Sequence, residues 1–371
     1  MNERKFLDLV YLKLFLSIEG IGPQKIFNLL SKFHSFENIF NSSKKELLEV
    51  DGINSTLSEK ILISKNNFNL IKSKFESELN ELEKFNGFII SFFDKDYPEL
   101  LKNIYFPPLI LYGIGDKSII NTNCIAIVGT RMPSSYGKGV AEKFSTELCS
   151  KDFTIVSGLA RGIDSIVHRS VLNNNGKTIA VIGTGLDIVY PPENKNLFEQ
   201  IKSEGLIITE FEFGTKPDAQ NFPRRNRIVS GLSLGTLVVE TKISGGALIT
   251  AAYALEQGRE VFSIPGQINS KQSEGTNSLI QKGEAKLVTC VEDILNELNV
   301  FSKEAKQAIS VKVDLTLFEE KIFNLLDSTP KHIDEIARLT NLSTSECLVH
   351  LLTLEFKGLV KQLPGKMFVI C

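Results

Sequence analysis

The fold is decided by the stretch Thr154-Ile155-Val156-Ser157-Gly158-Leu159-Ala160-Arg161-Gly162-Ile163-Asp164, in which an apolar run leads into a glycine-containing turn. The segment Ile125-Ala126-Ile127-Val128-Gly129-Thr130-Arg131 shows the same order, and glycine turns also follow apolar runs at residues 183–185 and 244–246. In an open α/β sheet, such turns direct free backbone N–H groups and the positive end of a helix dipole at one point, which favours anions. The repeated pattern predicts a surface that holds several phosphates.

Short apolar runs rich in β-branched residues recur between about residues 86 and 298. The runs are Phe88 to Phe92, Cys124 to Val128, Thr154 to Val156, Thr178 to Ile182, Leu206 to Thr209, Thr236 to Glu240 and Glu260 to Ile264. Several of them are apolar throughout instead of alternating, which is typical of parallel strands covered by helices on both faces. The sequence therefore predicts a doubly wound α/β domain over residues 86–298, with its ligand site at the carboxyl ends of the strands.

The length and composition predict a soluble protein of several domains. The chain has 371 residues, whereas single domains usually contain roughly 100–150 residues. Hydrophobic residues make up 42% of the chain and charged residues 23%, which excludes extensive disorder as the main feature. Because the formal net charge is only −2, a nucleic-acid partner would have to be bound by a focused groove and not by overall charge.

The cysteines predict neither a metal site nor a disulfide framework. All five are scattered along the chain without a CxxC pair, which fits a reducing cytoplasm. The apolar segment from Phe6 to Ile18 is interrupted by Asp8 and Lys13, and no run approaches the roughly 18 apolar residues that a membrane span needs. We expect a cytoplasmic protein without a membrane anchor.

Residues 1–82 have helical spacing and predict a small all-helical module. Two turns interrupt it, at Glu19-Gly20-Ile21-Gly22-Pro23 and at Val50-Asp51-Gly52-Ile53. The first turn has the form of a helix-hairpin-helix, in which glycines let backbone N–H groups face a DNA phosphate. The second has Asn54 near the place of its second glycine, and both turns can equally be read as plain connections in a module for protein contacts.

Residues 314–371 predict a winged helix. Helices are expected from Leu317 to Leu326, from Ile333 to Thr340, and after an N-cap at Ser343, followed by a hairpin across Pro364-Gly365. The third helix carries glutamates and a histidine but no arginine, so it is poorly suited to phosphates or guanine edges. This pattern favours a protein-contact or regulatory role over sequence-specific DNA binding.

The usual nucleotide fingerprints and catalytic groups are weakly represented. The turn that begins Gly183-Thr184-Gly185 lacks the last glycine of GxGxxG, so ordinary NAD binding is not indicated. His168 follows Asp164 by four residues on an expected helix, which predicts a structural hydrogen bond between them. Glu240 ends an apolar strand beside the Ser244-Gly245-Gly246 turn, where it could act as a base or, as we favour, bind backbone N–H groups near that turn.

The basic stretch Asn221-Phe222-Pro223-Arg224-Arg225-Asn226-Arg227 stands out against the low net charge. It could be a solvated charge run before a helix that starts near Ile228. An aromatic ring beside arginines is, however, what single-strand binding uses, because bases stack on rings and on guanidinium planes. Lys195 in the segment Pro191-Pro192-Glu193-Asn194-Lys195 could extend the same surface.

Taken in order, these motifs closely resemble the bacterial DNA-processing protein A (DprA, also called Smf) family. The motifs that carry the resemblance are Gly129-Thr130-Arg131, the stretch from Ser157 to Asp164, Gly183-Thr184-Gly185-Leu186-Asp187, Phe222-Pro223-Arg224-Arg225-Asn226-Arg227 and the stretch from Ser244 to Ala251. The resemblance covers about residues 86–298, and the flanking helical and winged-helix modules agree with the layout of that family.

The resemblance implies an extended Rossmann-like domain that binds single-stranded DNA, dimerises, protects incoming DNA and loads the RecA recombinase during natural transformation. It implies no enzymatic turnover, cofactor or metal ion. Carried over position by position, it implies DNA-binding roles for Arg131, Ser157, Gly158, Arg161, Phe222, Arg225 and Asn226, and also for Lys195, Lys242 and Gly245. Phosphates would be held by backbone N–H groups and Arg131, and bases by Phe222 and Arg225, so that recognition is independent of sequence.

Two other functions remain open from the sequence. A nucleotide-cleaving enzyme of the phosphoribohydrolase type would also pair a glycine-rich turn with a nearby glutamate, here Glu240. An inert scaffold would use the winged helix to recruit partners. The sequence does not identify the dimer surface, the surface that contacts RecA, the partner of the winged helix or the DNA-uptake ability of the host.

Overall fold

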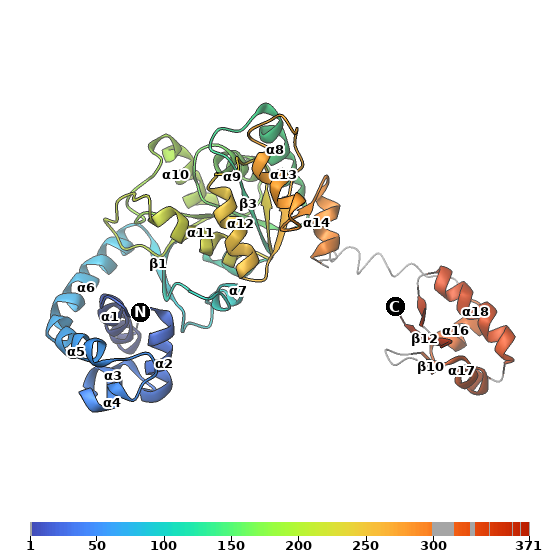
Figure 1. Ribbon diagram of the computed structural model, residues 1–371, viewed down its shortest axis with the longest axis horizontal. Helices are drawn as coiled ribbons and strands as arrows, with labels where there is room; N and C mark the ends of the chain where they lie inside the picture. The colour runs from blue at the N-terminus through green and yellow to red at the C-terminus, as the bar shows by residue number, and fades with distance from the viewer. Residues whose placement is uncertain are drawn as a thin grey trace. The chain divides into compact units, whose positions relative to one another are not determined.

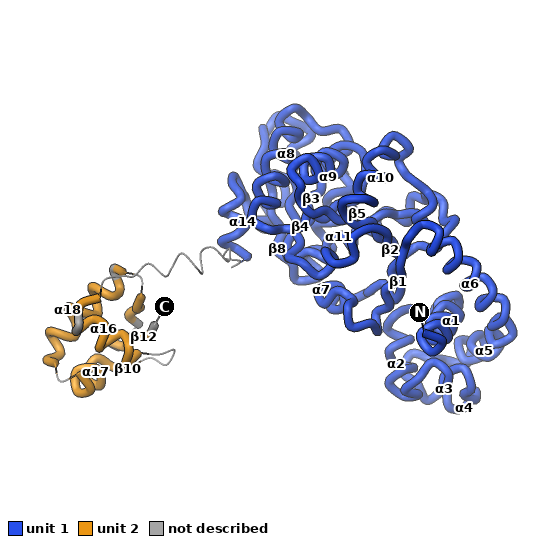
Figure 2. The backbone as a smooth tube through the Cα atoms, turned by 180° about the vertical axis from the view of Figure 1, so that it is seen from behind, with its two compact units in different colours: residues 1–300 blue, residues 301–371 orange. Residues whose placement is uncertain are grey.

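The computed structural model describes residues 2–298, 315–326, 331–340, 342–357, 359–363 and 365–370. The chain divides into two compact units, residues 1–300 and 301–371, which Figure 2 shows in different colours. The N-terminal helices and the α/β region, for which we expect separate domains over 1–82 and 86–298, both lie in the first unit. The predicted start of the third domain at residue 314 lies outside the described residues.

Among the residues that the structure describes, the centre of the first unit is a sheet of nine strands. Their order is β1-β2-β6-β5-β4-β3-β7-β8-β9. Its strands are β1 (Gly87–Ser91), β2 (Ile110–Gly115), β3 (Cys124–Val128), β4 (Thr154–Ser157), β5 (Thr178–Val181), β6 (Leu206–Thr209), β7 (Gly235–Val238), β8 (Glu260–Ser263) and β9 (Lys286–Leu287). Strands β3 to β9 pair in parallel, and β1 and β2 extend the sheet with antiparallel pairing. The predicted mainly parallel, doubly wound sheet is confirmed.

Both faces of the sheet are covered because successive residues of its strands are buried on opposite sides. Ile125 and Ile127 of β3 pack into one core cluster, whereas Ala126 and Val128 pack into another. One face is covered by α8 (Ser135–Ser150), α9 (Ile163–Asn173), α10 (Lys195–Glu204) and α14 (Val291–Glu297). The other is covered by α7 (Glu99–Lys102), α11 (Asn221–Gly231), α12 (Ala247–Glu256) and α13 (Glu274–Gln281). Helices α11 and α12 lie side by side (Figure 1).

Strand β2 has no counterpart among the strands expected from the sequence. It contains Gly113 and Gly115, which weaken a strand pattern. The structure gives Gly113 a steric reason, because a Cβ atom there would lie 2.4 Å from Cζ of Phe88 on β1. Gly113 thus weakens the strand pattern in the sequence, but its lack of a side chain is what lets the Phe88 ring lie against β2.

The N-terminal module is all-helical, as predicted. Its helices are α1 (Glu3–Leu16), α2 (Pro23–Phe33), α3 (Phe36–Asn41), α4 (Lys44–Leu48), α5 (Ser55–Ser64) and α6 (Phe68–Lys84). Gly20 and Gly52 adopt φ values of +92° and +78° in the two connecting turns, which side chains disfavour. The Asn54 side chain accepts a hydrogen bond from the Leu57 N–H at 2.9 Å, so the residue that departs from the hairpin pattern is the N-cap of α5.

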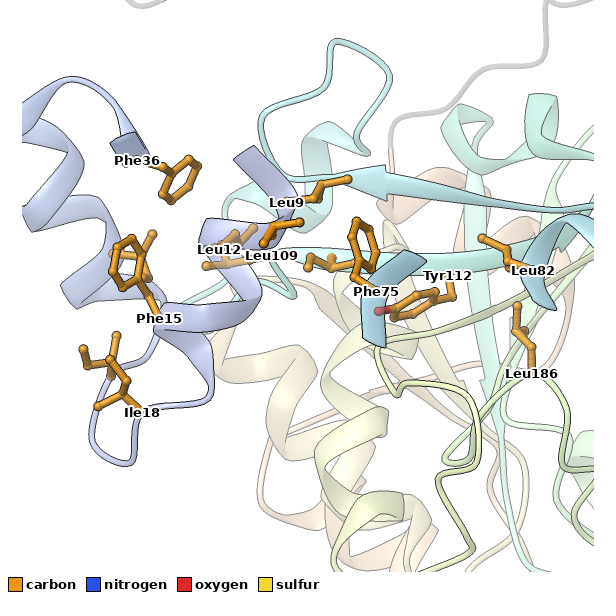
Figure 3. Packing of buried hydrophobic residues seen from close by; sticks show 14 of the residues in the cluster. Leu9, Leu12, Phe15, Ile18, Phe36, Phe75, Leu82, Leu109, Tyr112 and Leu186 are labelled. Atoms are coloured by element: carbon orange, nitrogen blue, oxygen red, sulfur yellow. The ribbon is translucent and has the colours of Figure 1, made fainter. Parts of the chain in front are cut away.

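These helices share one hydrophobic core with the edge of the sheet. Figure 3 shows Leu9, Leu12 and Phe75 of the helices close to Leu109 and Tyr112. At the same contact, the buried ammonium of Lys13 binds Glu78 at 2.5 Å, Glu212 at 2.6 Å and the Tyr112 hydroxyl at 2.8 Å. Burial, with Glu78 and Glu212 nearby, raises the pKa of Tyr112 well above its ordinary value, so this hydroxyl stays protonated.

The second unit has winged-helix architecture. It contains α16 (Leu317–Phe323), β10 (Lys331–His332), α17 (Ile333–Thr340), α18 (Thr344–Phe356), β11 (Val360–Leu363) and β12 (Met367–Ile370). The described strands pair in the order β10-β12-β11. The capping box between Ser343 and Glu346 is confirmed, and α16 ends at Phe323, before the predicted Leu326. In the part of the chain that is described, no helix is long and apolar enough to cross a membrane.

We predict that Glu78→Gln lowers the free energy of unfolding of the first unit by about 3 kcal/mol, because it leaves the buried Lys13 ammonium without its buried carboxylate. Lys13 and Glu78 have side chains that are only 8% and 9% exposed. Glu81→Gln on the same helix is the matched control, since its partner Lys84 is exposed and such pairs contribute at most about 1 kcal/mol. Urea unfolding followed by circular dichroism measures both, and equal effects would contradict the role of this ion pair.

Candidate nucleic-acid interface

The candidate site lies at the point in the sheet where the strand order reverses. Strands β3 and β7 are neighbours, but the chain proceeds from them toward opposite edges, which leaves a crevice at their carboxyl ends. The Thr130 N–H donates to the Glu240 carbonyl at 2.7 Å and joins the two loops there. A groove of about 760 Å³ opens at this point, and among the predicted site residues it is lined by Arg131, Gly158, Phe222, Arg225, Asn226, Lys242 and Gly245.

Three other predicted residues lie outside this groove. Arg161 lines a smaller adjoining pocket together with Arg131 and Phe222. Ser157 is fully buried, and its hydroxyl donates to the Ile127 carbonyl at 2.7 Å, so it supports the groove from below. Lys195 is exposed at the first position of α10 and lines neither cavity.

Arg225 is buried beneath the groove. Its guanidinium donates to the Val181 carbonyl, and only 4% of the residue is exposed. Burial lowers the pKa of Arg225 to about 10, while the nearby Asp164 carboxylate opposes this change. Burial raises the pKa of Asp164 in turn, and Arg225 opposes that rise. The two groups therefore stabilise each other's charge at the floor of the site.

Gly158 makes room for this guanidinium. A Cβ atom at residue 158 would lie 2.1 Å from Nη1 of Arg225. The Gly158 N–H, which we expected to face a phosphate, donates instead to Asp164 at 3.1 Å, and the Gly245 N–H donates to the Lys242 carbonyl at 2.9 Å. Amides at the start of α12 remain for an anion, and Gly246 and Ala247 there also line the groove.

The three arginines of the basic stretch have different environments. Helix α11 begins at Asn221 and not near Ile228, so the stretch is helical. Arg224 and Arg227, three residues apart and hence on one face, bind the Glu210 carboxylate at 3.2 and 2.5 Å. Arg225 lies on the other face. The residues of this stretch for which we expect DNA contacts, Phe222, Arg225 and Asn226, line the groove, whereas Arg224 and Arg227 pair with Glu210.

Aromatic and cationic groups meet at the rim. The Arg131 guanidinium lies 5.9 Å from the centroid of the Phe222 ring. The Tyr190 ring lies 5.4 Å from the Phe222 centroid, tilted by 33°. Tyr190 was missed in the sequence, although it follows an apolar strand and precedes Pro191-Pro192, close to the predicted Lys195.

Glu240 and His168 have structural partners. Glu240 is 2% exposed and accepts hydrogen bonds from the Ser134 N–H at 2.9 Å and the Ser134 hydroxyl at 2.5 Å, at the N-terminus of α8. It thus binds a backbone N–H, though not at the expected 244–246 turn. His168 does not bind Asp164 but pairs with the Thr178 hydroxyl at 2.7 Å. Burial lowers the pKa of His168 to about 3, so the ring is neutral.

A larger cavity of about 1240 Å³ lies between the N-terminal helices and the other face of α11. The first hairpin, Glu19 to Pro23, lines it, and a Cβ atom at Gly22 would lie 3.6 Å from the Phe106 ring. The cavity contains Lys13, Lys74, Arg224 and Arg227 together with Glu19, Glu78, Glu210, Glu212 and Glu256. This near balance of charge gives it no preference for polyanions.

We predict opposite effects for two glycine substitutions. Gly158→Ala should lower the free energy of unfolding by about 1–3 kcal/mol, because the new Cβ atom would displace Arg225. Gly139→Ala within α8 should raise it by up to about 1 kcal/mol, since a Cβ atom there meets nothing within 4 Å and alanine favours helix. Urea unfolding measures both changes, and a neutral Gly158→Ala would show that Arg225 needs no such space.

Three family models match the chain in sequence order. The model for a SAM-like helix-hairpin-helix tandem matches residues 12–64, the model for DNA recombination-mediator protein A matches residues 88–299, and the model for a DprA winged helix domain matches residues 311–366.

Relatives and solved structures agree with these models. Protein Smf of Synechocystis is 37% identical over 94% of this chain and 95% of its own length, and DprA of Bacillus subtilis is 45% identical over 55% and 69%. The crystal structure of DprA from Streptococcus pneumoniae superposes with a TM-score of 0.66 at 37% identity, covering 78% of this chain and 97% of that one. DprA from Helicobacter pylori, whose structure is described for its single-stranded DNA binding mode, gives 0.53 at 30% identity over 58% and 96%. The chain therefore belongs to the DNA-processing protein A (DprA/Smf) family.

Proposed function

We propose that this chain binds single-stranded DNA in the groove between β3 and β7. The observation that carries the proposal is the meeting of Arg131, Phe222, Arg225 and Lys242 in one groove, from three segments of the chain. The Helicobacter pylori relative, described as binding single-stranded DNA, supports the same ligand. The groove has three basic residues against two acidic ones, Asp164 and Asp218, and this local excess of positive charge also explains how a chain with a net charge of −2 could bind a polyanion.

The groove offers separate contacts for phosphates and bases. Arg131 and Lys242 are exposed, and the amides at the start of α12 add the positive end of a helix dipole. The Phe222 ring offers a stacking surface, which any base can use because every base has a π-face. Phosphate contacts and stacking carry no sequence information, so binding is independent of sequence, and stacking requires bases that are not already paired in a duplex.

We predict that Arg131→Ala weakens binding of a labelled single-stranded oligonucleotide about tenfold at low salt, because it removes a charged phosphate contact. The slope of log K against log salt should fall by about 0.7, the value for one phosphate contact with a single strand. Arg224→Ala is the matched control, since Arg224 faces the other cavity and binds Glu210. Fluorescence anisotropy in a salt series measures both, and equal losses would place the DNA elsewhere.

The structure gives little support to the alternative function, a nucleotide-cleaving enzyme. Glu240, the group that would act in that function, is buried and occupied by Ser134. We therefore propose a binding protein without catalytic turnover. Incubation with nucleoside monophosphates should release no free base, as measured by chromatography; release that is lost in Glu240→Gln would establish the enzyme instead.

We further propose that the chain acts in the cytoplasm as a homodimer that protects incoming strands and loads the RecA recombinase. Family membership supports this role. Helix α18 suits a protein contact, because it exposes Leu348, Val349 and Leu352 and contains no lysine or arginine between Thr344 and Phe356.

The loading proposal predicts that the chain shortens the lag before RecA covers a strand already bound by a single-strand-binding protein. The lag can be followed through the DNA-dependent ATPase activity of RecA. Arg131→Ala should shorten the lag less than the wild-type chain does, since it weakens the contact with the strand. A wild-type lag equal to that without the chain would contradict loading.

A further inference from the structure

A row of cationic and aromatic side chains crosses the carboxyl edge of the sheet. Arg131 follows β3 and lies over Phe222, at the start of α11. Phe222 contacts Tyr190, which follows β5. Arg161 follows β4, and together with Arg131, Tyr190 and Phe222 it lines one small pocket. The row thus has two rings in the middle and a guanidinium toward each end.

The two rings form one platform and not a clamp. Their centroids are 5.4 Å apart, within the range of about 4.5–7 Å for an aromatic pair in contact. A base held between two rings would need about 7 Å, twice the base spacing of about 3.4 Å. The rings are tilted by 33° to each other, and both are partly exposed. Gly183 supports the platform, because a Cβ atom there would lie 3.0 Å from Cδ1 of Phe222.

One end of the row is occupied by the protein's own carboxylate. The Arg161 Nε atom donates to Oε1 of Glu193 at 2.6 Å. This hydrogen bond raises the pKa of Arg161, and Tyr190 adds to the effect. Both side chains are about half exposed, at 48% and 54%, and exposed pairs of this kind contribute little to stability. A phosphate could therefore replace the carboxylate at low cost, gaining a charged hydrogen bond of the same kind.

We propose that Tyr190 is a second base-stacking residue beside Phe222, and that Glu193 occupies Arg161 in the free protein and yields it to a phosphate of the bound strand. The inference rests on the proposed single-strand function and adds two residues to it. Tyr190 contacts the strand, whereas Glu193 competes with it. A strand that follows the row has its phosphates at Arg131 and Arg161 and adjacent bases on the two rings.

The test uses the full chain and a short single-stranded oligonucleotide that contains 2-aminopurine, whose fluorescence falls when it stacks on a ring. The chain has no tryptophan, so the probe is read without interference. Tyr190→Leu should weaken binding about tenfold, the effect of removing one stacking ring, and should reduce the quenching. Tyr190→Phe should retain both. Tyr105→Leu, which removes an exposed ring in the other cavity, should change neither.

Glu193→Gln provides a readout of opposite sign. It frees Arg161 and removes a negative charge, so it should tighten binding by about 2- to 5-fold. Glu199→Gln is the matched control, since Glu199 is an exposed acid on α10 whose partner is Lys202 and not an arginine of the row. Because this variant tightens binding, a loss of folded structure could not imitate the result.

The outcomes separate the inference from the function it rests on. If Tyr190→Leu kept the affinity and quenching of the wild type, the stacking role would be overturned. If Glu193→Gln and Glu199→Gln had equal effects, the competition would be overturned. In both cases the wild-type chain would still bind single strands. Failure of the wild-type chain to bind single strands would overturn the proposed function, and the inference with it.

Discussion

The groove depends on a guanidinium that is buried before any ligand arrives. Placing the Arg225 charge under the carboxyl ends of the strands is costly, and the structure offsets the cost with the Val181 carbonyl and the neighbouring Asp164 carboxylate. The backbone around Gly158 is shaped by the same groups, because Asp164 accepts its N–H and the absent side chain leaves space for Arg225. The charge pair at the floor of the groove is therefore fixed by the fold.

Helix α11 divides its charges between two environments. Arg225 and Asn226 face the groove, whereas Arg224 and Arg227 share the single Glu210 carboxylate in the larger cavity, where acidic and basic residues nearly balance. This near balance on the second face keeps the field of the arginine-rich segment concentrated on the first. That arrangement reconciles a slightly acidic chain with a polyanionic ligand, since a focused field acts locally whatever the net charge.

The sequence predicts the sheet well because its signals are local. Strands buried on both faces, such as β3 and β6, are continuous apolar runs, and the bounds of both match the prediction. Strand β2 was missed because its two glycines, one of which makes room for Phe88, weaken the pattern. Most of the expected site residues do line the groove, because residues that follow parallel strands meet at one edge.

What the sequence could not show were contacts between distant segments. Glu210 lies far enough from the basic stretch that its two ion pairs leave no local pattern in the sequence. The burial of Ser157 depends on the neighbouring strand β3. The packing of the N-terminal helices on the sheet likewise arises from residues such as Lys13, Glu78 and Tyr112, which are far apart in the chain. Tyr190 is uncharged and is not part of a glycine turn, so no motif in the sequence marked it as a site residue.

The central claim is that this groove binds unpaired strands through phosphates and stacked bases. The most direct test is to compare the affinities of the wild-type chain for one oligonucleotide sequence in single-stranded and double-stranded form at several salt concentrations. The account predicts tighter binding of the single strand at every concentration, falling as salt rises. Equal or tighter binding of the duplex would contradict it.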